Sequence, residues 1–313
     1  MTGTHVVLGA TGSAGRAITI ALADAGLGVR AVSRGGSEVP GATGMAADVT
    51  RQEDVAAAVD GAAVVYMAAQ PPYHRWPELF PPMLDGVIEA TARVGAKLVM
   101  VDNLYAYGPV DGIMNEDTPE AATDRKGRVR HEMAQSLLAA HRAGRVRVAI
   151  GRASDYFGPA AENSAITSLA IGPAAAGKTM RWLLTFGAAH SIAYLPDVGR
   201  AFVALGTSDR ADGRVWHLPH PPAPTGGQLL DAVARALQGT GKRALVSKAM
   251  LYLAAPFSTI SRESLGIAYQ WERPFVVDDT RFRTTFGFEP TPLGDAVDGA
   301  VTWYRERVTA VVG

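Results

Sequence analysis

The chain has 313 residues, of which 48% are apolar, and its 30 lysines and arginines balance 30 aspartates and glutamates. This length suits a nucleotide-binding domain with a smaller partner, and the balanced charge provides no field to recruit nucleic acid or an anionic membrane. The absence of cysteine excludes disulfides, zinc–thiolate sites and thiol nucleophiles. A strand begins near His5 and no apolar run reaches the roughly 18 residues of a membrane span, so we expect a soluble cytoplasmic protein.

The first predicted element is a strand over 6–8 that breaks into a glycine-rich loop and then a helix over 16–25. We expect Gly9 to take the positive φ of the turn, Gly12 to let a ligand come close, and Gly15 to let the helix lie against its strand. Free N–H groups at the helix N-terminus would then face a pyrophosphate. The strand before and the helix after disfavour an ordinary glycine-rich turn. The loop is therefore assigned to cofactor binding, through Gly9, Thr11, Gly12, Ser13, Ala14 and Gly15.

The second strand, over 29–32, runs into Ser33 and Arg34. In dinucleotide-binding folds an acid at this place accepts a hydrogen bond from the 2′-hydroxyl of NAD. A hydroxyl and a guanidinium instead suit a 2′-phosphate, so we predict NADP as the cofactor, with NAD as the alternative. An arginine that is simply solvated in a loop is the other interpretation.

Strands and helices continue to alternate after this unit. The apolar patterns predict strands ending over 45–49 and 64–69, helices over 54–59 and 83–94, and strands over 97–101 and 147–151. Such alternation predicts an α/β fold with a doubly wound parallel sheet, the Rossmann arrangement. Beyond it the pattern loosens, and amphipathic helices follow over 227–237 and 293–307.

The strand over 64–69 ends in Ala68 and Ala69, whose small side chains would let a cofactor pass close over the sheet. We group the next residue, Gln70, with them. The segment 70–82 contains five prolines, at 71, 72, 77, 81 and 82, and is therefore predicted to be a loop beside the site.

The glycine spacing GxxGxxG resembles the cofactor loop of the extended short-chain dehydrogenase/reductases, the superfamily that holds the sugar-nucleotide epimerases and dehydratases. Residues 102–109 are similar to its Ser-Ser-x-x-Val-Tyr-Gly pattern, with Tyr107 and Gly108 setting the register, and 152–159 are similar to its Arg-Pro-x-x-Val-Tyr-Gly-Pro segment near the nicotinamide. The resemblance implies that Asp48 and Val49 lie beside the adenine. It also implies an NAD(P)-binding domain over 1–160 and a smaller, mixed α/β substrate-binding cap over 161–313, with some segments returning to the main sheet.

The sequence departs from this family at its catalytic positions. The resemblance implies a tyrosine that exchanges the substrate proton, a lysine that lowers its pKa and holds the ribose, and a Ser or Thr that binds the carbonyl. Here Asn103 takes the Ser or Thr position, Lys126 the tyrosine position and Arg130 the lysine position. A carboxamide can donate to a carbonyl oxygen, and Arg130 can keep the charge and the ribose contact but cannot deprotonate.

Lys126 is the candidate proton donor, because an ammonium is acid-competent at neutral pH and Arg125, Arg128 and Arg130 would lower its pKa. On a helix Lys126 and Arg130 share one face. The alternative is that the basic residues of 125–131 form a solvated helix start. Other proton donors near the cleft are Tyr105, Tyr107 and Tyr156.

We predict an NAD(P)-dependent oxidoreductase that acts by hydride transfer on a carbonyl or carbinol of a small molecule. A cofactor-recycling epimerase or dehydratase and a non-catalytic dinucleotide-binding regulator are the alternatives, and a homodimer is left open. We expect no metal site, because the histidines lack metal-ligand spacing: His217 and His220 precede prolines and read as a loop. Asp278 and Asp279 are predicted to lie in a loop that leads into a helix.

Overall fold

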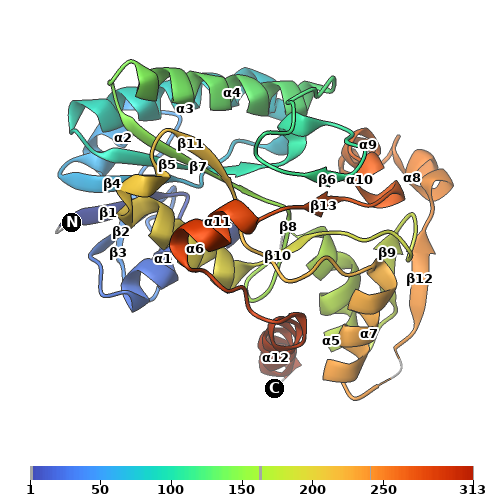
Figure 1. Ribbon diagram of the computed structural model, residues 1–313. Coiled ribbons are helices and arrows are strands. Elements are labelled where there is room, and N and C mark those ends of the chain that lie inside the picture. Colours follow the sequence, from blue (N-terminus) through green and yellow to red (C-terminus); the bar gives the residue numbers. More distant parts are fainter. Residues whose placement is uncertain (1–2, 162–163, 240, 313) are drawn as a thin grey trace.

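The computed structural model describes residues 3–161, 164–239 and 241–312, with side chains described for all of these except 259–261 and 308–312. Its centre is a seven-stranded sheet in the order β11-β7-β5-β4-β1-β2-β3, and every neighbouring pair is parallel (Figure 1). The strands are β1 (Thr4–Leu8), β2 (Val29–Ser33), β3 (Thr43–Ala46), β4 (Ala62–Met67), β5 (Lys97–Asn103), β7 (Arg147–Ala153) and β11 (Arg214–His217).

Helices cover both faces of this sheet. Along β1, Val6 and Leu8 face one apolar core and Val7 faces the other, as the two-residue period of a strand buried on both sides requires. The first core is closed by α2 (Gln52–Val59), α3 (Trp76–Arg93) and α4 (Arg125–Arg142). The second is closed by α1 (Ser13–Asp24), α6 (Leu195–Thr207) and α11 (Thr280–Phe286). The predicted doubly wound fold is confirmed.

The order of the strands reverses between β1 and β4, because the chain moves outward from β1 to β3 and then crosses to β4. In open α/β sheets ligands bind outside the carboxyl ends of the strands at such a switch point. The glycine loop after β1 and the segments after β4, β5 and β7 all lie at this edge.

The C-terminal part forms a third apolar core. Short parallel pairs join β8 (Asp155–Phe157) to β10 (Ile192–Tyr194) and β9 (Met180–Leu183) to β12 (Arg243–Val246). A further pair, β6 (Ile113–Met114) with β13 (Val276–Val277), belongs to a small fourth apolar cluster and links the two parts of the chain. The C-terminal part also contains the remaining helices. Its helices are a π-helical turn (Thr167–Ile171), α5 (Gly172–Ala175), α7 (Gly226–Ala236), α8 (Lys248–Ala254), α9 (Thr259–Gly266), α10 (Tyr269–Glu272) and α12 (Leu293–Val312).

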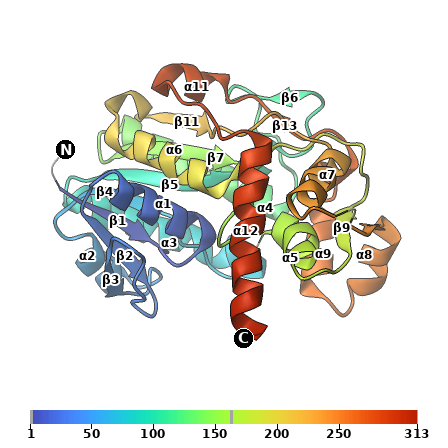
Figure 2. The same ribbon diagram turned by 90° about the horizontal axis from the view of Figure 1, so that it is seen from below.

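Figure 2 shows α12 running alongside α5, and its residues Ala296 and Val297 belong to the third core. The domain boundary at 160 stays a prediction, although α6 and β11 do pack with the main sheet as expected of returning segments. Within the described residues, no helix combines the length and the apolar character needed to cross a membrane.

The expectation of a loop over 70–82 holds only for 70–72 and is wrong for 73–82. A 3-10 turn (Tyr73–Arg75) leads directly into α3, which contains Pro81 and Pro82. Pro77 lies in the first turn, where no N–H is needed. Trp76, Phe80, Leu84 and Val87 follow at helical spacing and are buried, and this burial offsets the N–H groups that the two internal prolines lack.

The third strand also ends earlier than expected, at Ala46 rather than at 49. Asp48 explains the difference, because its Oδ1 accepts hydrogen bonds from the backbone N (2.9 Å) and the hydroxyl (2.7 Å) of Thr50. Such a side-chain turn competes with the strand ladder and reverses the chain before α2.

Candidate active site

The glycine loop has the backbone geometry that its sequence predicts. Gly9 has φ +86°, and a Cβ added there would lie 2.6 Å from the Cα of Ala69. A Cβ on Gly15 would lie 2.1 Å from the Gly9 carbonyl oxygen, so only glycine lets α1 approach β1 this closely. A Cβ on Gly12 would meet nothing nearer than that same oxygen at 3.4 Å, which leaves the outer side of the loop open.

The N-terminus of α1 is suited to an anion. Its N-cap is Gly12, which offers no capping side chain, and its first turn holds no acidic residue. The first backbone N–H groups of the helix therefore remain available at the positive end of the helix dipole. The Ser13 hydroxyl is engaged, donating to the carbonyl of Ala160 at 3.0 Å, whereas Thr11 is exposed beside the loop.

The other predicted cofactor residues lie along the same edge. Ser33 ends β2 with its Oγ accepting from the backbone N of Ser37 (3.2 Å), and Arg34 is exposed. The pKa of Asp48 is lowered, mainly by its hydrogen bonds from Thr50 and then by the charge of Arg34. The remaining residues of this group are Val49, which is buried, Ala68 and Ala69, which follow β4, and Gln70, which is exposed. Their contacts with a cofactor stay predictions.

Asn103 ends β5 with its amide oriented by the backbone. Its Oδ1 accepts from the N–H of Tyr105 at 3.1 Å, which leaves the amide N–H group to donate elsewhere. Tyr105 begins a 3-10 turn (Tyr105–Tyr107), and its hydroxyl accepts from that of Tyr73 at 3.2 Å. Burial raises the pKa of Tyr105 well above its ordinary value. Asn103 thus presents hydrogen-bond donors beside a pair of protonated phenols.

Lys126 lies in the first turn of α4, which Asp124 caps by accepting from its backbone N at 3.0 Å. Its ammonium pairs with the carboxylate of Glu263 on α9 and lies 3.9 Å from the centre of the Tyr73 ring. Arg125 and Arg128 are exposed, so the alternative of a solvated helix start describes those two residues but not Lys126. The structure brings Lys126, Tyr73 and Tyr105 together.

Arg130 points into the protein beneath this group. Its guanidinium carbon lies 4.3 Å from the ring centre of Trp76 and 4.6 Å from that of Phe80, and its NH1 is 3.3 Å from Asp102 Oδ1. Asp102 also accepts from Arg152 Nε at 2.8 Å. Burial lowers the pKa of Arg130, and the negative charge of Asp102 opposes that shift. Arg130 is therefore a buried, paired cation, and its contact with a ribose stays a prediction.

Two further residues join the site without having been predicted. Asp155 begins β8, next to Tyr156, and its Oδ2 lies 2.7 Å from Nε2 of His190, which precedes β10. Burial raises the pKa of Tyr156, whereas the nearby charge of Arg130 lowers it. A carboxylate inside the 152–159 segment was the available signal for Asp155. His190 had no local signal, because its role comes from a partner 35 residues away.

The family model for the NAD dependent epimerase/dehydratase family matches residues 5–218. The chain belongs to this family. The family is one of dinucleotide-dependent enzymes, so a nicotinamide dinucleotide cofactor and an enzymatic role follow at the level of the family. A search of curated protein sequences finds no match.

Solved structures of sugar-nucleotide enzymes share the fold over nearly their whole length. UDP-glucose 4-epimerase from Thermotoga maritima is 15% identical, with a TM-score of 0.80 over 97% of this chain and 99% of that one. A nucleoside-diphosphate-sugar epimerase from Pseudomonas aeruginosa is 17% identical, with a TM-score of 0.76 over 97% of this chain and 98% of that one. A dTDP-glucose 4,6-dehydratase from Bacillus anthracis, in complex with NAD, is 14% identical, with a TM-score of 0.79 over 97% of this chain and 96% of that one. At these identities the likeness establishes the fold of this family member.

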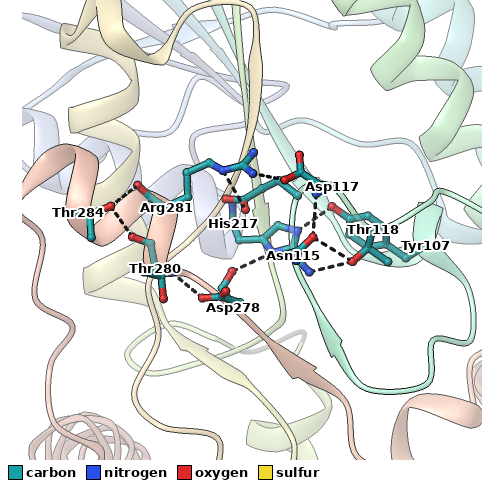
Figure 3. Close-up of polar contacts among 10 residues, drawn as sticks. Tyr107, Asn115, Asp117, Thr118, His217, Asp278, Thr280, Arg281 and Thr284 are labelled. Atoms are coloured by element: carbon teal, nitrogen blue, oxygen red, sulfur yellow. Dashed lines mark hydrogen bonds and ion pairs between the residues drawn. The ribbon is translucent and has the colours of Figure 1, made fainter.

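In this family member, Tyr107 has a structural role. Figure 3 shows Tyr107 with its hydroxyl on Nε2 of His217 (2.7 Å), while Nδ1 of His217 lies 3.2 Å from the carbonyl of Asp278. Burial, followed by the charge of Arg152, lowers the pKa of His217 to about 3, so the ring is neutral and accepts from Tyr107. The hydroxyl proton of Tyr107 is therefore bound by His217 and is not available to a substrate.

The same cluster ties distant segments together. Arg281, from α11, pairs with Glu116 at 3.6 Å and also with Asp117 (Figure 3). His220 is held by backbone groups as well, with its Nε2 3.1 Å from the carbonyl of Val277. Among the described residues no group of histidines and carboxylates is arranged to hold a metal ion.

Proposed function

We propose that the protein transfers hydride between a nicotinamide dinucleotide and a carbonyl or carbinol of a small molecule, with NADP(H) favoured. The observation that carries the proposal is the group of Asn103, Tyr105 and Lys126 at the carboxyl end of β5. This group lies at the same sheet edge as the open N-terminus of α1, on the other side of the switch point.

The side chains of this group have complementary chemistry. The Asn103 amide can donate to a carbonyl oxygen, and the positive charge of the Lys126 ammonium can stabilise the alkoxide that forms there. Glu263 and the Tyr73 ring hold the ammonium in place. When bound, the cofactor supplies or accepts the hydride.

The preference for NADP rests on the end of β2. Ser33 and Arg34 stand where an acid would accept from the 2′-hydroxyl of NAD, and the exposed guanidinium can form charged hydrogen bonds to a 2′-phosphate. Asp48 follows β3 rather than β2, so it does not stand at that place.

Membership of the epimerase/dehydratase family favours one alternative, a reaction in which the cofactor is oxidised and reduced again within one turnover. Mass spectrometry of small molecules retained through purification would identify substrate candidates, which are then incubated with the protein and NADPH or NADP. Net oxidation or reduction of the cofactor supports the proposed function. Product formation with tightly held, unconsumed cofactor supports the alternative, and binding without turnover would mean that the chain is a dinucleotide-binding regulator.

A further inference from the structure

His190 is a buried histidine whose ring is fixed by its neighbours. Its ring stacks on Trp271, with centres 4.3 Å apart and planes at 21°, and on Phe275 at 5.3 Å and 30°. Its backbone N–H donates to the carbonyl of Pro224 at 2.8 Å. The residue is buried, and its ring cannot turn its nitrogen atoms elsewhere without disturbing this packing.

Both nitrogen atoms of this ring face oxygen atoms. Nδ1 lies 3.0 Å from the carbonyl of Gln270, which can only accept, so Nδ1 carries a hydrogen. Nε2 lies 2.7 Å from Asp155 Oδ2, and a lone pair cannot face a carboxylate at this distance. A further proton therefore lies between Nε2 and Oδ2, carried either as imidazolium and carboxylate or as imidazole and carboxylic acid.

Asp155 is the solvent-accessible member of this pair. Its side chain is 27% exposed, against 3% for that of His190. Its negative charge adds to burial in raising the pKa of Tyr73 and of Tyr105, whose hydroxyls are hydrogen-bonded to each other. His190 before β10 is hydrogen-bonded to Asp155, and the Asp155 charge also acts on Tyr73 before α3, Tyr105 after β5, Tyr156 on β8 and Tyr269 on α10.

We infer that Asp155 is an acid–base residue of this site and that His190 is the positioning residue that stores its proton. The inference rests on the proposed function and deepens it by naming the source of the proton. In the direction of reduction, the carbonyl carbon gains hydride from the reduced nicotinamide and the C=O π pair moves onto oxygen. That oxygen forms its O–H bond as the O–H bond of Asp155 breaks, while the Lys126 ammonium keeps its protons and stabilises the alkoxide by charge.

The donation leaves His190 neutral, with its hydrogen on Nδ1 and the Nε2 lone pair facing the Asp155 carboxylate. This arrangement is unfavourable, so a proton from water re-enters through the exposed side of Asp155 and restores the pair. Oxidation of a carbinol follows the same steps in reverse.

The first test needs no substrate. In the full chain labelled with ¹⁵N-histidine, the His190 signals, assigned by their loss in His190→Gln, should show a ring that carries or shares protons at both nitrogen atoms near neutral pH. Asp155→Asn removes the carboxylate, and the ring should then show a single N–H. A His190 spectrum that is the same in Asp155→Asn and in the natural chain would overturn the inference.

The second test is single-turnover oxidation of bound NADPH by a carbonyl identified as above, or by 4-nitrobenzaldehyde as the probe. Asp155→Asn should slow it by about 10²–10⁴-fold and flatten its pH profile, with NADPH affinity unchanged. Asp155→Glu should recover part of the rate, and Asp111→Asn, an exposed carboxylate paired with Arg273, should match the natural chain. Natural rate and pH profile in Asp155→Asn would refute the role of Asp155. Absence of turnover in the natural chain would instead count against the proposed function. The spectra would still show whether Asp155 and His190 share a proton.

Discussion

The cofactor loop and the catalytic cluster are built in different ways. The loop over 9–15 is one continuous stretch in which backbone N–H groups and the spaces left by glycine provide the binding surface. The cluster gathers side chains from both halves of the molecule, and each cation in it meets a carboxylate: Arg130 meets Asp102 and Lys126 meets Glu263. The imidazole of His190 likewise lies against Asp155.

This difference shows where a sequence can depart from its family. A backbone site depends on steric room at particular glycines, so its pattern is fixed residue by residue. A site made of paired side chains tolerates a new charge when a partner neutralises it, because a buried charge is costly only when it is unpaired. Arg130 can be buried where the resemblance predicts the lysine of the family, because Asp102 lies beside it.

The largest expected effect separates the two functions of glycine in the loop. Gly12→Val should abolish dinucleotide binding in a folded protein, with affinity lowered by at least about a hundredfold, roughly 2.7 kcal/mol. Gly15→Val should instead unfold or destabilise the domain, because its Cβ would lie 2.1 Å from the Gly9 oxygen. Titration calorimetry and circular dichroism distinguish the two, and unchanged binding in folded Gly12→Val would refute the site assignment.

On the catalytic side, Lys126→Ala should lower turnover by about 10²–10⁴-fold with cofactor affinity nearly unchanged, because the group that stabilises the reacting oxygen is lost. Lys126→Tyr should recover only part of the rate, since Arg130 stands in place of the family's lysine. Steady-state kinetics and NADPH titration provide the measurement. If Lys126→Ala is as active as the natural chain, the role of Lys126 is refuted, and Tyr105→Phe and Tyr156→Phe are the next variants.

Asp102→Asn tests the pairing of charges beneath the cluster. It leaves the buried guanidinium groups of Arg130 and Arg152 facing a neutral amide, so the free energy of unfolding should fall by about 3–5 kcal/mol. Urea denaturation measures this change, and Asp111→Asn, an exposed ion pair, is the matched control. A loss as small as that of the control would show that the buried network contributes little.

Arg34→Ala tests the predicted preference for NADP over NAD at the end of β2. Loss of a charged hydrogen bond should weaken NADPH binding by about 1.5–3 kcal/mol and leave NADH binding nearly unchanged. Dissociation constants for both dinucleotides are needed, and equal losses for the two would remove the argument for NADP.

The last prediction concerns the pH dependence of stability. The pKa of His217 is about 3 in the folded protein and about 6.5 when unfolded. As pH falls below about 6.5, the unfolded chain gains a proton that the folded one excludes, so stability falls by up to about 1.4 kcal/mol per pH unit until the folded pKa is reached. His217→Gln should remove this part of the slope in urea titrations at about pH 6.5 and 4.5. An unchanged slope would mean that His217 does not stay neutral.

The sequence by itself determined the features that depend on near neighbours. The alternation of strands and helices, the positive φ of Gly9 and the close contact at Gly15 follow from short-range steric rules, and the structure has them where they were expected. A strand was likewise expected over 97–101, and β5 has this place in the structure but runs two residues further, to Asn103.

Only the tertiary structure decided which charges meet. Lys126 and Glu263 are 137 residues apart, and Asp155 and His190 are 35 apart, so no local pattern could pair them. The helix through Pro81 and Pro82 has the same origin, since local propensity argues against it and burial of Trp76 and Phe80 outweighs that preference. Backbone geometry is set within a few residues, whereas burial and ion pairing depend on what the fold brings alongside.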